Sequence, residues 1–224
     1  MSLPRTVALH LGKDMRLEWR SKDAANSMLF FALLVVVVFA FAFDPLAEES
    51  RLIAGGIGWV ALLFATVVAL NQSWARELRN GVLDALRLAP APANALFLGK
   101  VIANFLFVAI VEILITPVFV AFYNLRVLGS GWQLILVAAL GTWALVGNGT
   151  FFAALSIRTR SRELMLPLIL FPISLPALLA MVMATTNILT AERVPTDWIK
   201  LLTVYDVVFT AVSLLLFESV LEAE

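Results

Sequence analysis

Two carboxylates inside long apolar segments are the first residues of this sequence that could do chemistry. Glu112 falls near the middle of one segment, and Asp206 lies several residues inside another. A charged side chain at the centre of a bilayer costs about 3 kcal/mol or more unless it is neutral, paired or facing water. Glu112 is therefore either a transport residue or a protonated hydrogen-bonding group between helices. In the second case its candidate partners are Asn104, Asn148 and Thr116. The polar stretch before Asp206 predicts a position near the membrane interface.

Chemistry of other kinds is disfavoured by what the chain lacks. Cysteine is absent, and His10 is the single histidine. Clustered imidazole or thiolate ligation and a Ser–His catalytic pair therefore have no basis. The sequence contains no G-x-x-x-x-G-K-[ST] motif, so the chain is not itself a P-loop ATPase. The net charge is zero, which disfavours a nucleic-acid partner. We expect no enzyme activity and no cofactor or metal bound by this chain.

Six apolar segments must position these residues. The chain has 224 residues, of which 62% are hydrophobic and 14% charged, against about 25% charged in soluble domains. Crossing a bilayer as a helix takes about 20 apolar residues. The first 23 residues have no apolar core like that of a cleavable signal peptide. We predict one all-α transmembrane domain over residues 1–224, with spans at 24–43, 52–70, 101–123, 132–157, 164–185 and 199–217.

The distribution of basic residues predicts the orientation of these spans. Twelve of the 16 Lys and Arg residues fall in residues 1–23, 71–100 and 158–163, and four fall in the alternate connections or at their edges. Lys and Arg in short loops are retained on the cytoplasmic side. The pattern therefore predicts that both termini are cytoplasmic.

Residues 1–23 have the pattern of an amphipathic helix. Five apolar residues recur at every fourth position, with basic residues between them, and Pro4 suits a helix start. The apolar set is Leu3, Val7, Leu11, Met15 and Trp19. We predict a helix that lies on the membrane, with its basic face toward anionic headgroups and Trp19 at the interface. The alternative is a segment that serves only as a topology signal.

The connection at residues 71–100 carries a second amphipathic pattern. Trp74, Leu78 and Val82 share one helical face, Gly81 interrupts the helix, and Pro90 and Pro92 follow it. A short helix of this kind outside the membrane suits docking in the groove of a partner. The alternative is a solvated loop.

Small residues and prolines shape the remaining spans. Glycines cluster at 55–58 and 141–149, where they permit close helix approach. The fifth span contains Pro167, Pro172 and Pro176, each of which removes a backbone donor. We predict that this span is a broken helix, followed by a partly re-entrant segment through about residue 198.

Particular residues in this layout resemble the membrane subunits of type-2 ABC exporters, whose permease fold has six spans. An acidic-Gly-Leu-Pro-Lys signature of that group is matched by Glu77, Gly81, Leu83, Asp84, Leu86, Leu88 and Pro90, then Gly99 and Lys100. L-G-T-W-A-L-V-G-N-G-T at 140–150 and the proline-spaced run at 156–176 are similar to the heme exporter protein B family of cytochrome c maturation. The resemblance covers nearly the whole chain.

The resemblance implies a subunit of the bacterial inner membrane that dimerises and binds two copies of a separate ABC ATPase. It also implies a heme-handling membrane subunit and a periplasmic heme chaperone as partners, with ATP bound in the ATPase and heme handled by the complex. The helix at 71–100 would then be the cytoplasmic coupling helix. Its ATPase contacts would be made by Arg76, Glu77, Leu78, Arg79, Gly81, Asp84 and Leu86.

The residue types of this chain bear on whether it could bind heme itself. Stable heme ligation uses His, Cys, Met or Tyr, and Met165, Met181 and Met183 offer only weak axial contacts. We therefore expect the chain to transmit ATP-driven movement, in heme export or in release of the loaded chaperone, while a partner supplies the axial ligands. Direct passage of heme, export of a lipid, drug or glycan precursor, and proton-coupled transport through Glu112 are the alternatives.

Overall fold

The structure, a computed structural model, describes residues 3–43, 48–79, 92–156, 159 and 161–222. These residues form helices and connections and contain no strand. The helices are α1 (Leu3–Ser21), α2 (Asp23–Ala42), α3 (Glu48–Arg79), α5 (Ala93–Phe122), α6 (Gly131–Ser156), α7 (Arg162–Thr190) and α8 (Thr196–Glu222). The all-α prediction is confirmed.

Six of these helices, α2, α3 and α5 to α8, are long and apolar enough to cross a membrane. The apolar stretch of α3 runs over Leu52–Leu78, and the other helices lie over the predicted ranges with ends that differ by one to eight residues. At ~1.5 Å per residue, even the 20 residues of α2 span about 30 Å, the thickness of the hydrocarbon core. The chain is a multi-pass membrane protein.

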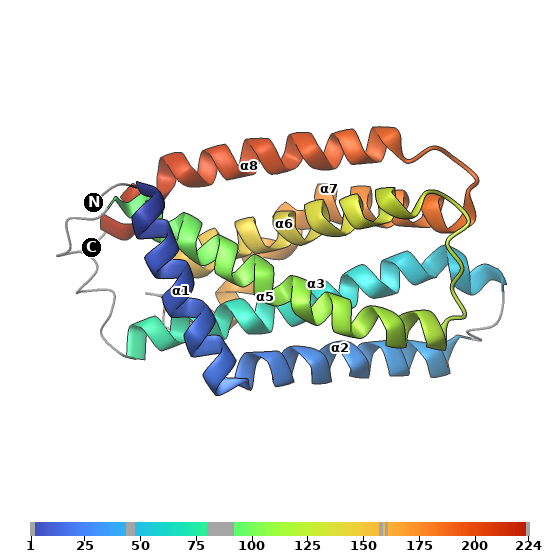
Figure 1. The fold of residues 1–224 in the computed structure, drawn as a ribbon, viewed down its shortest axis with the longest axis horizontal. Helices are drawn as coiled ribbons and strands as arrows, with labels where there is room; N and C mark the ends of the chain where they lie inside the picture. The colour runs from blue at the N-terminus through green and yellow to red at the C-terminus, as the bar shows by residue number, and fades with distance from the viewer. Residues whose placement is uncertain (1–2, 44–47, 80–91, 157–158, 160, 223–224) are drawn as a thin grey trace.

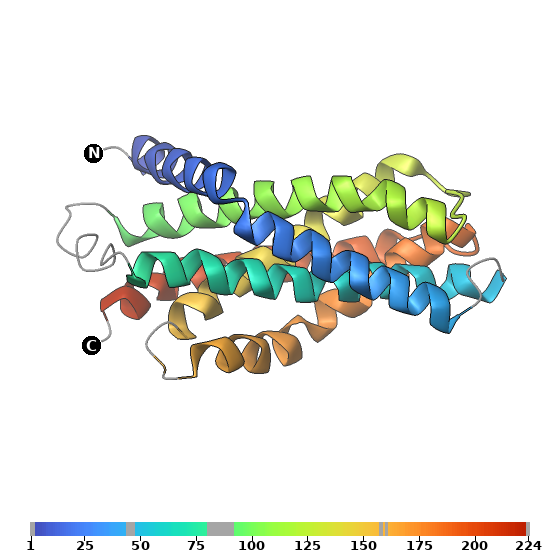
Figure 2. The ribbon, with the colours of Figure 1, turned by 90° about the horizontal axis from the view of Figure 1, so that it is seen from below.

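The spans form a long bundle that α1 crosses at one end (Figures 1 and 2). This near end also holds both termini, the end of α3 and the start of α5. The opposite far end holds the end of α2, the start of α3 and the connections 122–131 and 190–196. Lys22, with a φ of 55°, joins α1 to α2 where the chain changes direction.

Glycines bring α3, α6 and α7 together as predicted. A Cβ at Gly141 would collide with the Trp59 ring, and one at Gly149 with the Leu70 side chain, both in α3. A Cβ at Gly55 would stand 3.3 Å from Thr185 in α7. These glycines therefore let neighbouring helices approach closely at the centre of the bundle.

Two helices differ from the predicted layout. The helix of the second span does not stop near residue 70 but continues as α3 to Arg79, so the predicted docking segment begins as an extension of that helix, in which Trp74 is buried. The fifth span is not broken, because α7 is one helix of 29 residues that contains all three prolines and bends along its length (Figure 2). Transmembrane helices tolerate proline where neighbours satisfy the freed backbone. The Pro172 carbonyl lacks the donor that Pro176 cannot supply. Beside it, Tyr205 of α8 donates its hydroxyl to the Ile173 carbonyl at 2.9 Å.

The predicted re-entrant segment is also wrong. The helix α7 runs to Thr190, a left-handed residue at Ala191 ends it, and α8 begins at Thr196. Residues 191–195 form a short connection at the far end.

Candidate functional site

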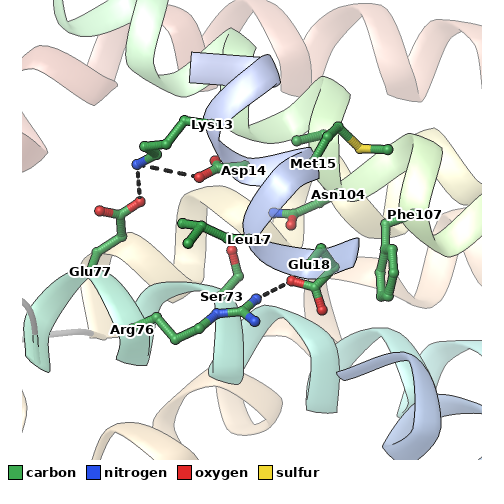
Figure 3. Close-up of a pocket in the computed structure, with 11 residues that line it drawn as sticks. Lys13, Asp14, Met15, Leu17, Glu18, Ser73, Arg76, Glu77, Asn104 and Phe107 are labelled. Atoms are coloured by element: carbon green, nitrogen blue, oxygen red, sulfur yellow. Dashed lines mark hydrogen bonds and ion pairs between the residues drawn. The ribbon is translucent and has the colours of Figure 1, made fainter. Parts of the chain in front are cut away.

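A cluster of four charged side chains joins three helices at the near end. Lys100 Nζ in α5 lies 2.9 Å from Glu77 Oε1 in α3 and 3.3 Å from Asp14 Oδ2 in α1. Lys13 Nζ of α1 also contacts Glu77, at 2.6 Å, as Figure 3 shows. We call Lys13, Asp14, Glu77 and Lys100 the coupling cluster. Its two positive and two negative charges balance, so the attraction between them offsets part of the cost of removing each ion from water.

Lys100 is the centre of this cluster. Its side chain is 1% exposed, and its ammonium lies 4.8 Å from the ring centroid of Trp74, a cation–π contact. Because Glu77 and Lys100 stand on either side of residues 80–91 in sequence, their ion pair joins the two helices that flank that segment.

A second set of contacts ties α1 to α3 (Figure 3). Arg76 forms an ion pair with Glu18 and donates to Ser21 Oγ at 3.1 Å. One helical turn earlier, Gln72 donates to Ser27 Oγ of α2 at 3.3 Å. The last turns of α3 are therefore held to both N-terminal helices by polar contacts.

The orientation of α1 differs from the predicted one. Its charged side chains Lys13, Asp14 and Glu18 face the bundle, while Leu9 and Trp19 are exposed, Trp19 at 71%. The reason is electrostatic, because α3 and α5 present buried charges that need partners. The outward position of Trp19 agrees with its predicted place at the interface.

Burial and charge shift the ionisation of two α1 side chains. Burial alone would lower the pKa of Lys13, but its hydrogen bond to Glu77 and the charge of Asp14 outweigh burial and raise the pKa above 10.5. For His10, burial and then the charge of Lys13 lower the pKa from 6.5. The docked helix therefore favours charged Lys13 and neutral His10.

The predicted coupling residues divide into three groups. Arg76 and Glu77, assigned by sequence to ATPase contacts, are instead paired within the chain, and Leu78 is 44% exposed. The side chain of Arg79 lies outside the description, as do residues 80–91 with Gly81, Asp84 and Leu86. Leu78 is thus the described coupling residue that is free to meet a partner.

Sequence analysis missed the role of Lys100 and of the acidic residues in α1. Lys100 entered only as a loop charge and a signature position. Asp14 and Glu18 are four residues apart in an otherwise basic helix, so they lie on one face. That pair was the signal for an inward acidic face.

Glu112 finds a different partner from those predicted. Thr142 of α6 donates its hydroxyl to Glu112 Oε2 at 2.6 Å, whereas Thr116 donates only to the Glu112 backbone carbonyl. Asn104 donates to Thr150 at 3.2 Å, and Asn148 donates to the Tyr205 hydroxyl at 2.8 Å. Three polar contacts thus join α5 to α6 and α6 to α8.

Asp206 lies deeper than predicted. It is the eleventh residue of α8, about 15 Å from the start of that helix, and is 6% exposed. Within the described part of the chain, neither carboxyl oxygen has a hydrogen-bond partner. The polar residues before it lie in the last turn of α7, in the 190–196 connection and in the first turn of α8, so they do not place Asp206 near the interface.

A cavity of about 540 Å³ lies beside Glu112, between α2, α3, α5 and α6. Its wall is almost wholly apolar, and Glu112, Thr116, Thr142 and Thr185 are its polar lining side chains, apart from the indole of Trp59. Trp59 donates its indole N–H to Thr185 at 2.9 Å. The cavity thus resembles a binding site for a hydrocarbon chain, with a few hydrogen-bonded polar groups in its wall.

Comparison with known proteins agrees with this architecture. A family model described as CcmB protein matches residues 5–223. Heme exporter protein B of Rhodobacter capsulatus is 33% identical over 169 residues, which are 75% of this chain and 77% of that relative. The Pseudomonas aeruginosa protein of the same name is 30% identical over 178 residues, 79% of each chain. The one from Escherichia coli K12 is 35% identical over 94 residues, 42% of each.

Proposed function

Because this chain belongs to the CcmB protein family, we propose that it is the permease subunit of an ATP-driven complex in cytochrome c maturation. A separate ABC ATPase hydrolyses ATP, and this subunit couples that reaction to heme export or to release of the heme-loaded periplasmic chaperone. The names of its relatives support heme as the cargo of the complex.

The coupling cluster is the observation that carries this proposal. Residues 80–91, together with Leu78 before them, form the proposed ATPase contact. Displacement of this segment pulls on the end of α3 and the start of α5, which Glu77 and Lys100 join to each other. Because Asp14 and Lys13 belong to the same cluster, α1 moves with these two helices. Movement at the ATPase thereby reaches the spans as a displacement of three linked helices.

The proposed assembly is a homodimer with two ATPase copies, located in the bacterial inner membrane with both termini in the cytoplasm. The near end then faces the ATPase, and the far end faces the periplasm. A heme-handling membrane subunit and a periplasmic chaperone supply the axial ligands.

Replacement of Leu78 by Glu tests the docking proposal. The side chain is already exposed, so the charge should not disturb the fold, but burying it unpaired in a partner groove costs several kcal/mol. We expect Leu78→Glu to insert normally, to lose the co-purifying ATPase and to abolish cytochrome c maturation. Glu77→Lys is unsuitable for this purpose, because Glu77 is buried in the coupling cluster.

Lys200→Glu is the matched control, because it introduces an exposed charge at the far end. It should keep both the ATPase and maturation. If Leu78→Glu also retains the ATPase at the normal ratio and supports maturation, the docking proposal is wrong.

A further inference from the structure

The cavity beside Glu112 is elongated along the bundle. Its lining on α5 extends from Phe105 to Val120, which is about 22 Å of helix at 1.5 Å per residue. One leaflet of hydrocarbon is about 15 Å thick. Leu125 and Val127, in the far-end connection, continue the lining beyond α5. The cavity is therefore as long as a leaflet is deep and reaches the far end.

The cavity also opens sideways between α5 and α6. Ile113 and Ile135 line it and are 70% and 73% exposed. These residues belong to membrane-spanning segments, where the surrounding medium is hydrocarbon. Apolar space open to that medium gains dispersion contacts when a hydrocarbon chain enters it. The wall has no charged group other than Glu112, whose Oε2 is already satisfied by Thr142.

The far-end connection that continues the cavity lining carries one cationic residue. Arg126 lies between Leu125 and Val127 in sequence, is exposed, and forms no ion pair with any residue that the structure describes. A guanidinium binds a phosphate through two parallel hydrogen bonds. An apolar channel and a free guanidinium at its end are the two parts that a phospholipid requires.

We propose that the cavity between α2, α3, α5 and α6 holds one acyl chain of a bilayer phospholipid, with Arg126 binding its phosphate at the far end. The lipid is a bound component rather than the exported cargo. It fills the space beside Glu112 and separates α5 and α6 at their outer edge. This inference does not depend on the ATPase-docking proposal.

Native mass spectrometry of the detergent-purified protein, equilibrated with phosphatidylglycerol, tests the site. We expect one tightly retained phospholipid per chain. Ala138→Phe fills the cavity and should reduce retention at least tenfold, and Arg126→Gln should weaken it several-fold. Two controls should retain the lipid: Arg193→Gln removes another exposed far-end arginine, and Leu179→Phe enlarges an exposed apolar side chain outside the cavity.

The outcomes separate the possible occupants. Loss of lipid in Ala138→Phe and Arg126→Gln, with both controls unchanged, supports the site. Equal retention in all four variants, or no retained phospholipid in the wild-type protein, overturns it. Heme retained in place of lipid also overturns it. If Ala138→Phe does not fold, Ala109→Leu fills the same cavity from α5 and replaces it in the comparison.

Discussion

Removal of the buried ammonium of Lys100 should release α1 from the bundle. Lys100→Met keeps much of the apolar stem but leaves Glu77 and Asp14 with Lys13 as the remaining cation of the cluster. Breaking a buried ion pair by removing one partner costs about 3–5 kcal/mol. Because Lys13 still compensates part of the negative charge, we use the lower end of this range, about 3 kcal/mol, as the loss of docking free energy. At 1.36 kcal/mol per tenfold, the undocked population of α1 should rise about a hundredfold.

A single cysteine reports this equilibrium, because the chain has none of its own. Ser73 is buried beside the coupling cluster in the small cavity between α1 and α3. The thiol-labelling rate of Ser73→Cys should therefore rise about a hundredfold when Lys100→Met is added.

Lys200→Met is the matched control, since Lys200 pairs at 3.5 Å with Asp197 in an exposed contact worth at most about 1 kcal/mol. Glu77→Gln added to Lys100→Met should restore part of the protection, because it removes the uncompensated carboxylate. If Lys100→Met labels no faster than the Lys200→Met control, the cluster does not hold α1 in place.

Three further changes probe other contacts with the same labelling assay or with thermal unfolding. Gly99→Ala should speed labelling of Ser73→Cys, because a Cβ there would stand 2.7 Å from His10 Cβ and 3.1 Å from a backbone oxygen of α1, whereas Gly12→Ala, with open space around it, should not. Relative to an exposed cysteine labelled at the same pH, which corrects for the loss of reactive thiolate, labelling of Ser73→Cys should become faster as the pH falls from 6.5 toward the lowered pKa of His10, because docking favours the neutral imidazole. His10→Gln should flatten that pH dependence. Thr142→Val should lower the unfolding temperature by removing a hydrogen bond worth about 1–3 kcal/mol, while Glu112→Gln, which keeps an acceptor, should have the smaller effect.

The features that a local sequence pattern determines were predicted correctly. Apolar length located the six spans, and the glycines near 55 and 141–149 indicated close helix contacts. The sequence did not reveal the features that depend on a contact with a residue far away in the chain. The end of α3 was predicted as a separate docking helix whose Arg76 and Glu77 contact the ATPase, yet the partners of these two residues in the structure lie 58 and 64 residues away in α1. The helix α7 continues through three prolines, which its own sequence does not reveal.

The central claim is that ATP-driven movement passes through the coupling cluster. It is tested most directly by the labelling rate of Ser73→Cys in the reconstituted complex, measured without nucleotide and during ATP turnover. We predict that turnover changes the rate and that Leu78→Glu, which should lose the ATPase, removes the change. An identical rate in every nucleotide state, with the ATPase bound and hydrolysing ATP, would contradict the account.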